Sequence, residues 1–149
     1  MPFERFPGVE LEVDHFEVGV YEAMVPAVPA TFNRPQTVIR TSQAWEVRVE
    51  WDEIGQVAGL IPGNWIVDAY VESIGAGGEF KVGQWIGPLF AGHHMANIVV
   101  GAGVPALAAG ELQTPFRLVI TLTAERPDNT RYPMAGYLEG PILQFYRTP

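Results

Sequence analysis

The chain has 149 residues, a formal net charge of −8 and no cysteine. This length fits one domain, residues 1–149, that can bury a core without covalent cross-links. The acidic pI of about 4.7 excludes a basic nucleic-acid surface and disfavours an anionic membrane as partner. The lack of cysteine, together with an N-terminus that carries no signal-peptide pattern, favours a cytoplasmic protein.

The N-terminal segment alternates apolar and acidic residues, with Val9, Leu11 and Val13 on one face. After His15 the apolar positions change parity and continue at Phe16 and every second residue beyond it. A parity change within one strand predicts a β-bulge or a break between two strands. Residues 24–35 contain three prolines and are therefore predicted to form an extended edge or loop.

Two segments in the middle of the chain are predicted to form the central strands. In Trp45–Trp51 the two tryptophans and two valines share one parity, and charged residues hold the other. Trp65–Val71 repeats this alternation, with Asp68 and Glu72 on the polar side. Side chains on a strand alternate between its two faces, so both segments predict an antiparallel sheet with one buried and one wet face.

The other segments complete an all-β pattern. We expect short strands over Thr37–Thr41, Glu79–Val82 and Phe116–Thr123, the last in the middle of a sheet. Met134–Tyr137 and Pro141–Tyr146 are predicted to form the final strand or strands. Turns are predicted at Gly75–Gly78 and Arg126–Thr130, and one helical turn at Ile54, Val57 and Leu60. About seven to nine strands with regular turns predict an antiparallel β-sandwich, immunoglobulin-like or jelly-roll-like, with a closed β-barrel as the alternative.

Residues 82–110 contain no Asp, Glu, Lys or Arg. Their longest apolar portion is too short and too rich in glycine and proline to span a membrane. Interface cores are poor in charge and rich in aromatic residues and methionine, so this stretch predicts a homo-oligomer contact. The predicted interface residues are Trp85, Ile86, Leu89, Phe90, Met95, Val104 and Leu107. The alternative is that these side chains fill the core of a monomer.

His93 and His94 are the candidate metal ligands. On a turn they could hold zinc or nickel together with His15 or Glu79. On a strand, neighbouring residues point to opposite faces and cannot share one ion. We therefore expect no catalytic metal centre and no cofactor, with one imidazole capping a loop and the other packed.

Carboxylates give a second candidate chemistry. Glu50, Asp52 and Glu53 gather at the end of one predicted strand, and Asp68 and Glu72 lie on another. Paired carboxylates could hydrolyse glycosides or bind calcium. A solvated acidic sheet face explains the same pattern, and neither serine lies in a nucleophile elbow. The sequence therefore favours a protein that is not an enzyme.

Aromatic residues give a third candidate site. Trp85 lies among glycines and could join Tyr132 and Tyr137 in a flat platform for sugar rings, by analogy with carbohydrate-binding modules. Packing of these rings against the core is the favoured alternative. Taken together, the sequence predicts a structural or assembly subunit whose partner is itself or another protein. A sandwich that binds carbohydrate or metal is the alternative, and a hydrolase is the least favoured function.

Overall fold

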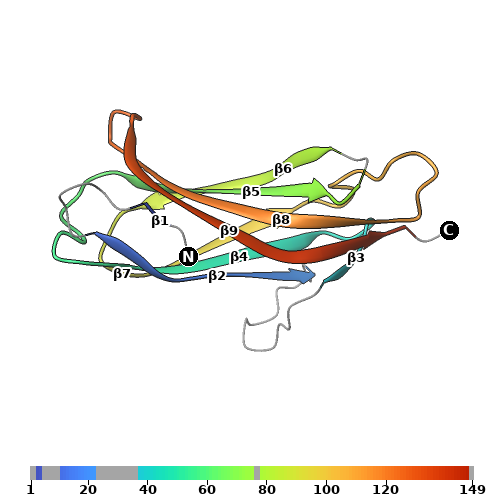
Figure 1. The fold of residues 1–149 in the computed structure, drawn as a ribbon, viewed down its shortest axis with the longest axis horizontal. Helices are drawn as coiled ribbons and strands as arrows, with labels where there is room; N and C mark the ends of the chain where they lie inside the picture. The colour runs from blue at the N-terminus through green and yellow to red at the C-terminus, as the bar shows by residue number, and fades with distance from the viewer. Residues whose placement is uncertain (1–2, 5–10, 23–36, 76–77, 148–149) are drawn as a thin grey trace.

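The computed structural model describes residues 3–4, 11–22, 37–75 and 78–147, and within them it contains β-strands and no helix. It confirms the predicted all-β sandwich (Figure 1). No helix long and apolar enough to cross a membrane occurs in this part of the chain. The strands are β1 (Phe3–Glu4), β2 (Glu12–Glu22), β3 (Val38–Arg40), β4 (Trp45–Ile54), β5 (Asn64–Ser73), β6 (Glu79–Pro88), β7 (Gly92–Val100), β8 (Gln113–Glu125) and β9 (Arg131–Tyr146).

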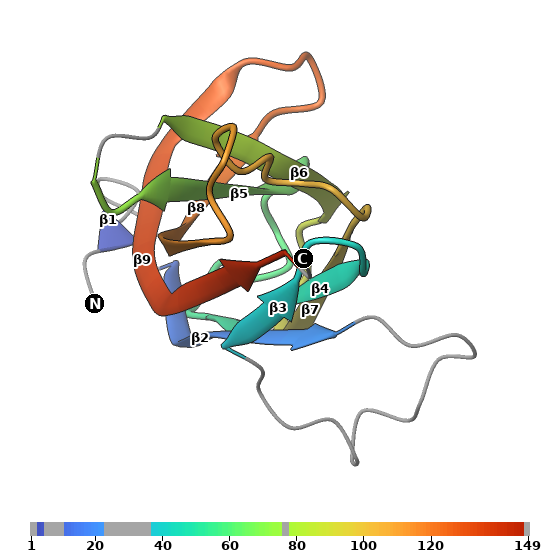
Figure 2. The same cartoon turned by 90° about the vertical axis from the view of Figure 1, so that its right-hand side faces the viewer.

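Two sheets pack face to face. The larger has the order β1-β9-β8-β5-β6, and β3 also pairs with β9, in parallel. The smaller has the order β2-β4-β7. The strands follow the long axis, so their connections gather at the two ends of the molecule (Figures 1 and 2). As predicted, the Phe116–Thr123 segment lies in the middle of a sheet, as part of β8 between β5 and β9.

The core between the sheets follows the predicted alternation. In β4 the residues Trp45, Val47, Val49 and Trp51 are buried, and the charged residues between them are partly exposed. The inward face of β5 is buried in the same way, but Asp68 on its predicted wet face is only 8% exposed. This carboxylate accepts a hydrogen bond from Gln84 (2.7 Å) and pairs with Lys81 (3.0 Å). Both neighbours come from β6, which lies beside β5 and covers a position that alternation alone would expose.

The predicted bulge in β2 is confirmed. The pairing of β2 with β4 shifts register between Asp14 and Glu17, and His15 takes a left-handed conformation with φ of 50°. Leu11 and Phe16, on either side of the bulge, are both buried. The extra residue therefore restores the burial of the apolar positions after the parity change. Val9 and the predicted loop at residues 24–35 lie outside the described residues.

One local prediction differs from the structure. The segment containing Val57 and Leu60 forms consecutive turns instead of a helical turn, with hydrogen bonds from Ala58 N to Gly55 O (3.2 Å) and from Leu60 N to Val57 O (2.9 Å). Glycines within the segment favour turns over a helix. The C-terminal segments, for which the sequence allows one strand or two, form one continuous strand, β9, whose pairing with β8 shifts register.

Glycines allow the two sheets to approach at both long sides. A Cβ on Gly83 of β6 would collide with Ile98 of β7. A Cβ on Gly140 of β9 would lie 3.2 Å from Val18 of β2. Gly83 and Gly140 therefore let β6 approach β7 and β9 approach β2, so that the core is enclosed along both sides of the sandwich.

Candidate functional site

The structure distributes the predicted interface residues over several surfaces. Ile86 (52% exposed) lies on the outer face of the larger sheet, and Met95 (42% exposed) lies on the outer face of the smaller sheet. Phe90 and Val104 are exposed in connections at opposite ends of the sandwich. The remaining three, which pack partly buried against the core, are Trp85, Leu89 and Leu107. These residues therefore do not form one continuous patch.

Exposed apolar side chains instead occur at both ends. One end consists of the 55–63 and 89–91 connections, and its exposed apolar residues are Ile54, Leu60 and Phe90. Leu60 is 74% exposed, the highest value for a large apolar residue in the described part of the chain. The other end holds the turn after β5 and the 101–112 connection, and its exposed apolar residues are Ile74, Phe80, Val104 and Leu112. Contiguous exposed apolar patches mark interaction surfaces, whereas single exposed apolar residues are ordinary.

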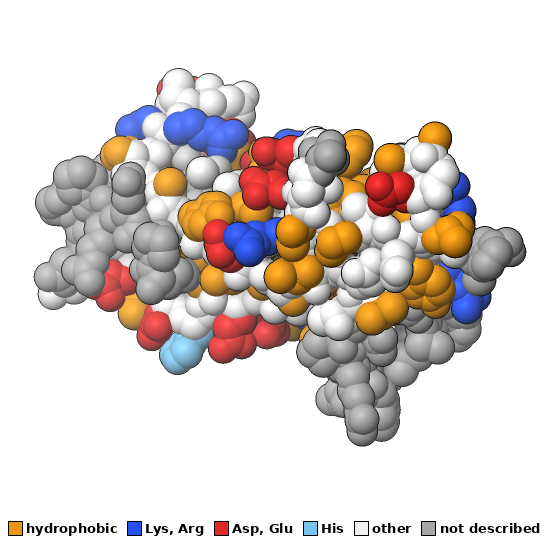
Figure 3. Space-filling model, turned by 45° about the vertical axis from the view of Figure 1, so that its right-hand side comes forward, with side chains coloured by type: hydrophobic (Ala, Val, Ile, Leu, Met, Phe, Trp, Pro, Cys, Tyr) orange, Lys and Arg blue, Asp and Glu red, His pale blue; other side chains and the backbone are white. Residues whose placement is uncertain are grey.

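The second end contains a cavity of about 310 Å³. Most of its lining is apolar, and the space-filling view shows apolar side chains gathered over this part of the molecule beside carboxylates (Figure 3). The Phe80 and Phe116 rings meet edge to face with their centroids 6.2 Å apart. Leu107 closes one side of the cavity, and Glu111, bonded to Thr114 (2.8 Å), supplies its carboxylate. The cavity therefore suits an apolar group.

The flanks of the sandwich also carry exposed apolar residues. Three exposed apolar residues there stand opposite charged ones on the neighbouring strand: Met95 faces Glu50, Val99 faces Glu46 and Ile142 faces Arg117. Ile86 instead faces Ile66. Exposed apolar side chains therefore occur on the flanks as well as at both ends.

The adjacent histidines point to opposite faces of β7. His94 is buried, stacks on Trp51 with ring centroids 5.1 Å apart, and bonds through Nε2 to the Phe90 carbonyl (2.8 Å). His93 is exposed on the outer face of the smaller sheet. The two imidazoles therefore cannot share an ion. No group of three or more His, Cys, Asp or Glu able to hold a metal is found among the described residues.

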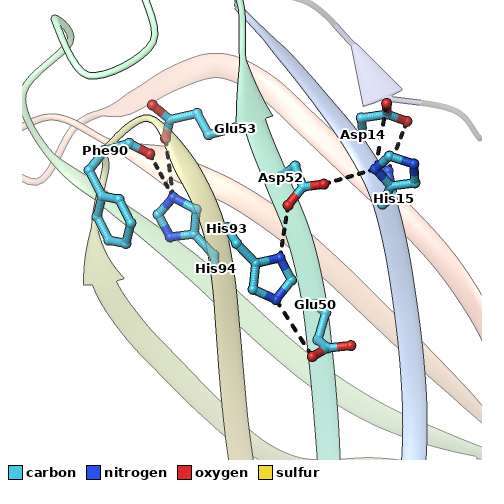
Figure 4. Close-up of polar contacts among 8 residues, drawn as sticks. All are labelled: Asp14, His15, Glu50, Asp52, Glu53, Phe90, His93 and His94. Atoms are coloured by element: carbon cyan, nitrogen blue, oxygen red, sulfur yellow. Dashed lines mark hydrogen bonds and ion pairs between the residues drawn. The ribbon is translucent and has the colours of Figure 1, made fainter.

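Asp52 links two histidines across three strands (Figure 4). Its two carboxylate oxygens bond to Nδ1 of His15 on β2 and Nδ1 of His93 on β7, each at 2.8 Å. Nε2 of His93 lies 3.6 Å from the Glu50 carboxylate. The hydrogen bond to Asp52 raises the pKa of His15 above 6.5, and Asp14 and Glu17 add to this effect.

The same hydrogen bonds shift the pKa values of His93 and Asp52. The hydrogen bond to Asp52, with added attraction from Glu50, raises the pKa of His93. The bonds from His93 and His15 lower the pKa of Asp52 below 3.8. An imidazole bonded to a carboxylate resembles the base of a catalytic dyad. This cluster lies on an open sheet face and its groups favour their charged forms, so the geometry suits an ionic bridge between strands.

Glu53, the third carboxylate of the predicted cluster, is held inside the core by hydrogen bonds. Glu53 is buried, whereas Glu50 and Asp52 occupy the outer face. One Glu53 oxygen accepts from Trp65 Nε1 (2.7 Å) and lies 3.7 Å from His94 Nε2, and the other accepts from Gly59 N (3.1 Å). Glu53 therefore cannot join Asp52 around one sugar, and it fastens the 55–63 connection to the core.

The aromatic residues predicted as a sugar platform lie apart. Trp85 faces the interior and meets Trp51 edge to face at 5.7 Å. Tyr137 is exposed on the outer face of the same sheet and donates to Glu139 (3.1 Å). Tyr132 donates its hydroxyl to the Pro62 carbonyl (2.6 Å) at the end of the sandwich. These three rings do not form a common flat surface.

Sequence reasoning missed the exposed residues that define the two ends. The sequence predicts a helical turn at Leu60 and a strand at Phe80, and it gives no prediction for the exposure of Ile74 and Leu112. An apolar residue beside glycine in a turn is a weak signal that could have identified Leu60. Comparisons with known proteins found no matching family model and no matching curated protein. The described surfaces are therefore the basis for a functional proposal.

Proposed function

We propose that this protein is a non-catalytic subunit that acts through protein–protein contacts and associates with copies of itself. The observation that carries this proposal is the exposed apolar surface at both ends of an elongated sandwich. Burying apolar surface is the main driving force of protein association, at roughly 25 cal/mol per Å² removed from water. A protein with exposed apolar side chains at both ends can gain this free energy by placing one end against another molecule.

Composition supports the same proposal. Only 17% of the residues are charged, below the usual quarter, whereas 48% are hydrophobic. The 101–112 connection, which borders the cavity, has its first charged residue at Glu111. Few charges near this end would need to be desolvated in a contact.

Light scattering across a dilution series tests the proposal. We expect a mass above the monomer value of 16.4 kDa that rises with protein concentration, because association is a mass-action equilibrium. A mass that stays at 16.4 kDa from micromolar to millimolar concentration would contradict self-association.

A further inference from the structure

We propose that the bond between His15 and Asp52 is a pH-sensitive latch on the edge of the smaller sheet, closed while the His15 imidazole is charged and loosened when it is neutral. The latch acts on residues 12–17 at the start of β2, and it does not depend on the proposed self-association. Figure 4 shows the bond crossing from β2 to β4. Histidine suits this role because its charge changes between about pH 5 and about pH 8.

The start of β2 is separated from the rest of that strand by the bulge. β2 lies at the edge of the smaller sheet and pairs with β4. The pairing covers Glu12–Asp14, is interrupted at the bulge and resumes over Glu17–Glu22. Beyond the bulge, Gly140 of β9 approaches Val18, so that part of β2 has a neighbour in the other sheet as well. The short section before the bulge can therefore separate from β4 while the pairs beyond it remain.

His15 itself has a backbone conformation that needs support. Its φ of 50° lies in the left-handed region, which residues other than glycine seldom adopt and keep only where surrounding contacts hold them. The His15 amide donates to Asp14 Oδ1 (2.8 Å), within the same strand. Its imidazole Nδ1 bonds to Asp52 Oδ2 (2.8 Å), across the sheet. The second bond therefore holds the bulge against β4.

Carboxylates surround the His15 imidazole. Among the described residues, the charged groups that face it are Asp52 of β4 and, from its own strand, Asp14 and Glu17, and together they raise its pKa. The His15 side chain is 70% exposed, so it exchanges protons with the solvent directly. A charge-assisted hydrogen bond is roughly twice as strong as a neutral one. The bond to Asp52 therefore weakens as the pH rises through the raised pKa of His15.

The other side of the bridge lacks the features of a latch. His93 of β7 bonds through Nδ1 to the second Asp52 oxygen (2.8 Å), and Glu50 also faces it. Both carboxylates raise the pKa of His93, so this imidazole titrates too. β7 pairs with β4 through this position without a shift of register. Loss of charge on His93 therefore removes an ion pair from a regular ladder, which stays paired through its backbone.

Separation of residues 12–17 would change what the sheet edge exposes. Leu11 is fully buried and Val13 is 9% exposed, and both lie beside this section. The backbone groups of Asp52–Ile54 face the same section across the ladder. Opening would place apolar side chains and unpaired backbone groups in water, and an unpaired strand edge is a site to which another strand can add. The latch keeps this edge covered at acidic pH more firmly than at alkaline pH.

Hydrogen exchange at about pH 5.5 and about pH 8.5, on either side of the range in which histidine titrates, tests the latch. Protection factors, which correct for the intrinsic pH dependence of amide exchange, are compared for residues 12–17, 18–22 and 92–100. His15→Asn removes the titrating group, and asparagine also adopts the left-handed conformation. The matched control, His93→Asn, removes the other imidazole of the bridge. Both histidines are exposed, so both variants should fold, and denaturation midpoints check this.

We expect the protection of residues 12–17 to fall by about twofold to fivefold from the lower to the higher pH, the range that an exposed ion pair can supply. The fall should occur in the unmodified protein and in His93→Asn, and residues 18–22 and 92–100 should change less. In His15→Asn the protection of residues 12–17 should be low at both pH values.

Several results would overturn the latch. One is a pH effect that is absent from the unmodified protein, including exchange of residues 12–17 at the intrinsic rate at both pH values. A second is an effect that persists in His15→Asn or disappears in His93→Asn, because His15 would then not be its source. A third is an equal fall over residues 18–22 and 92–100, which would show that the whole sheet responds and that the opening is not local.

Discussion

Trp45 of β4 is one of the largest fully buried side chains in the core. It is 1% exposed, its ring meets Phe145 edge to face at 5.3 Å, and its Nε1 donates to Val104 O (2.8 Å). We expect Trp45→Ala to lower the free energy of unfolding by about 3–5 kcal/mol, because it leaves a cavity and an unpaired carbonyl. Denaturant titration measures this change. Glu46→Gln, on the opposite face, should stay within about 0.5 kcal/mol, and an equal effect at both positions would contradict the assigned faces.

The Asp52 bridge predicts a pH-dependent contribution to stability. The raised pKa values of His15 and His93 favour folding below about pH 6.5, and this contribution is lost as the pH rises through the raised values. The lowered pKa of Asp52 favours folding above about pH 3.8, and this contribution is lost as the pH falls through the lowered value. The stabilising window therefore lies between these two pH values.

Asp52→Asn tests this window. The difference in denaturation midpoint between the unmodified protein and the variant should be largest in the window. It should narrow at alkaline pH, because the imidazoles are then neutral and no longer form ion pairs with the Asp52 carboxylate. Asp128→Asn is the control: the pKa of Asp128 is lowered by bonds from Thr130 and not by an imidazole, so its effect should change only in acid. An Asp52 effect that is constant from acid to alkaline pH would exclude the bridge.

At the scale of elements, β6 and β7 approach closely because Gly83 of β6 has no side chain. A Cβ at Gly83 would collide with Ile98, so Gly83→Ala should destabilise the fold by about 1–3 kcal/mol through overpacking. Ile98→Ala creates room at the same place. We therefore expect the double variant to be more stable than the sum of the two single effects predicts, as a double-mutant cycle would measure.

A second glycine provides the control for that cycle. Gly101 has open space around its Cβ position and no left-handed backbone. Gly101→Ala should therefore change the free energy of unfolding by less than about 0.5 kcal/mol. Strict additivity of Gly83→Ala and Ile98→Ala would show that the two strands are not packed through this contact.

For the whole molecule, net charge opposes the proposed association. Two copies that each carry −8 repel one another, while an exposed ion pair contributes only about 0–1 kcal/mol. Raising the ionic strength from about 0.01 M to about 1 M shortens the Debye length from about 30 Å to about 3 Å. We expect the average mass in light scattering to rise with salt. A mass that falls with salt would indicate that ion pairs, and not apolar burial, hold the copies together.

The sequence by itself determined several of the strands and their inward faces, but it did not predict β7, which lies within residues 82–110. Alternation in Trp45–Trp51 and Trp65–Val71 identified the buried residues, and the parity change at His15 located the bulge. These features could be read because strand geometry is local: residues two apart share a face whatever the rest of the chain does. The separation of His93 from His94 followed from the same rule.

Only the tertiary structure decided which surfaces lie together. Asp52 meets His15 and His93 because β4 lies between β2 and β7, and Phe80 shares a cavity with Leu107 because two connections gather at one end. Strand order and sheet packing depend on contacts between residues distant in sequence, which no local period encodes. Residues 82–110, a single charge-free stretch in the sequence, are for this reason distributed over two ends, two flanks and the core.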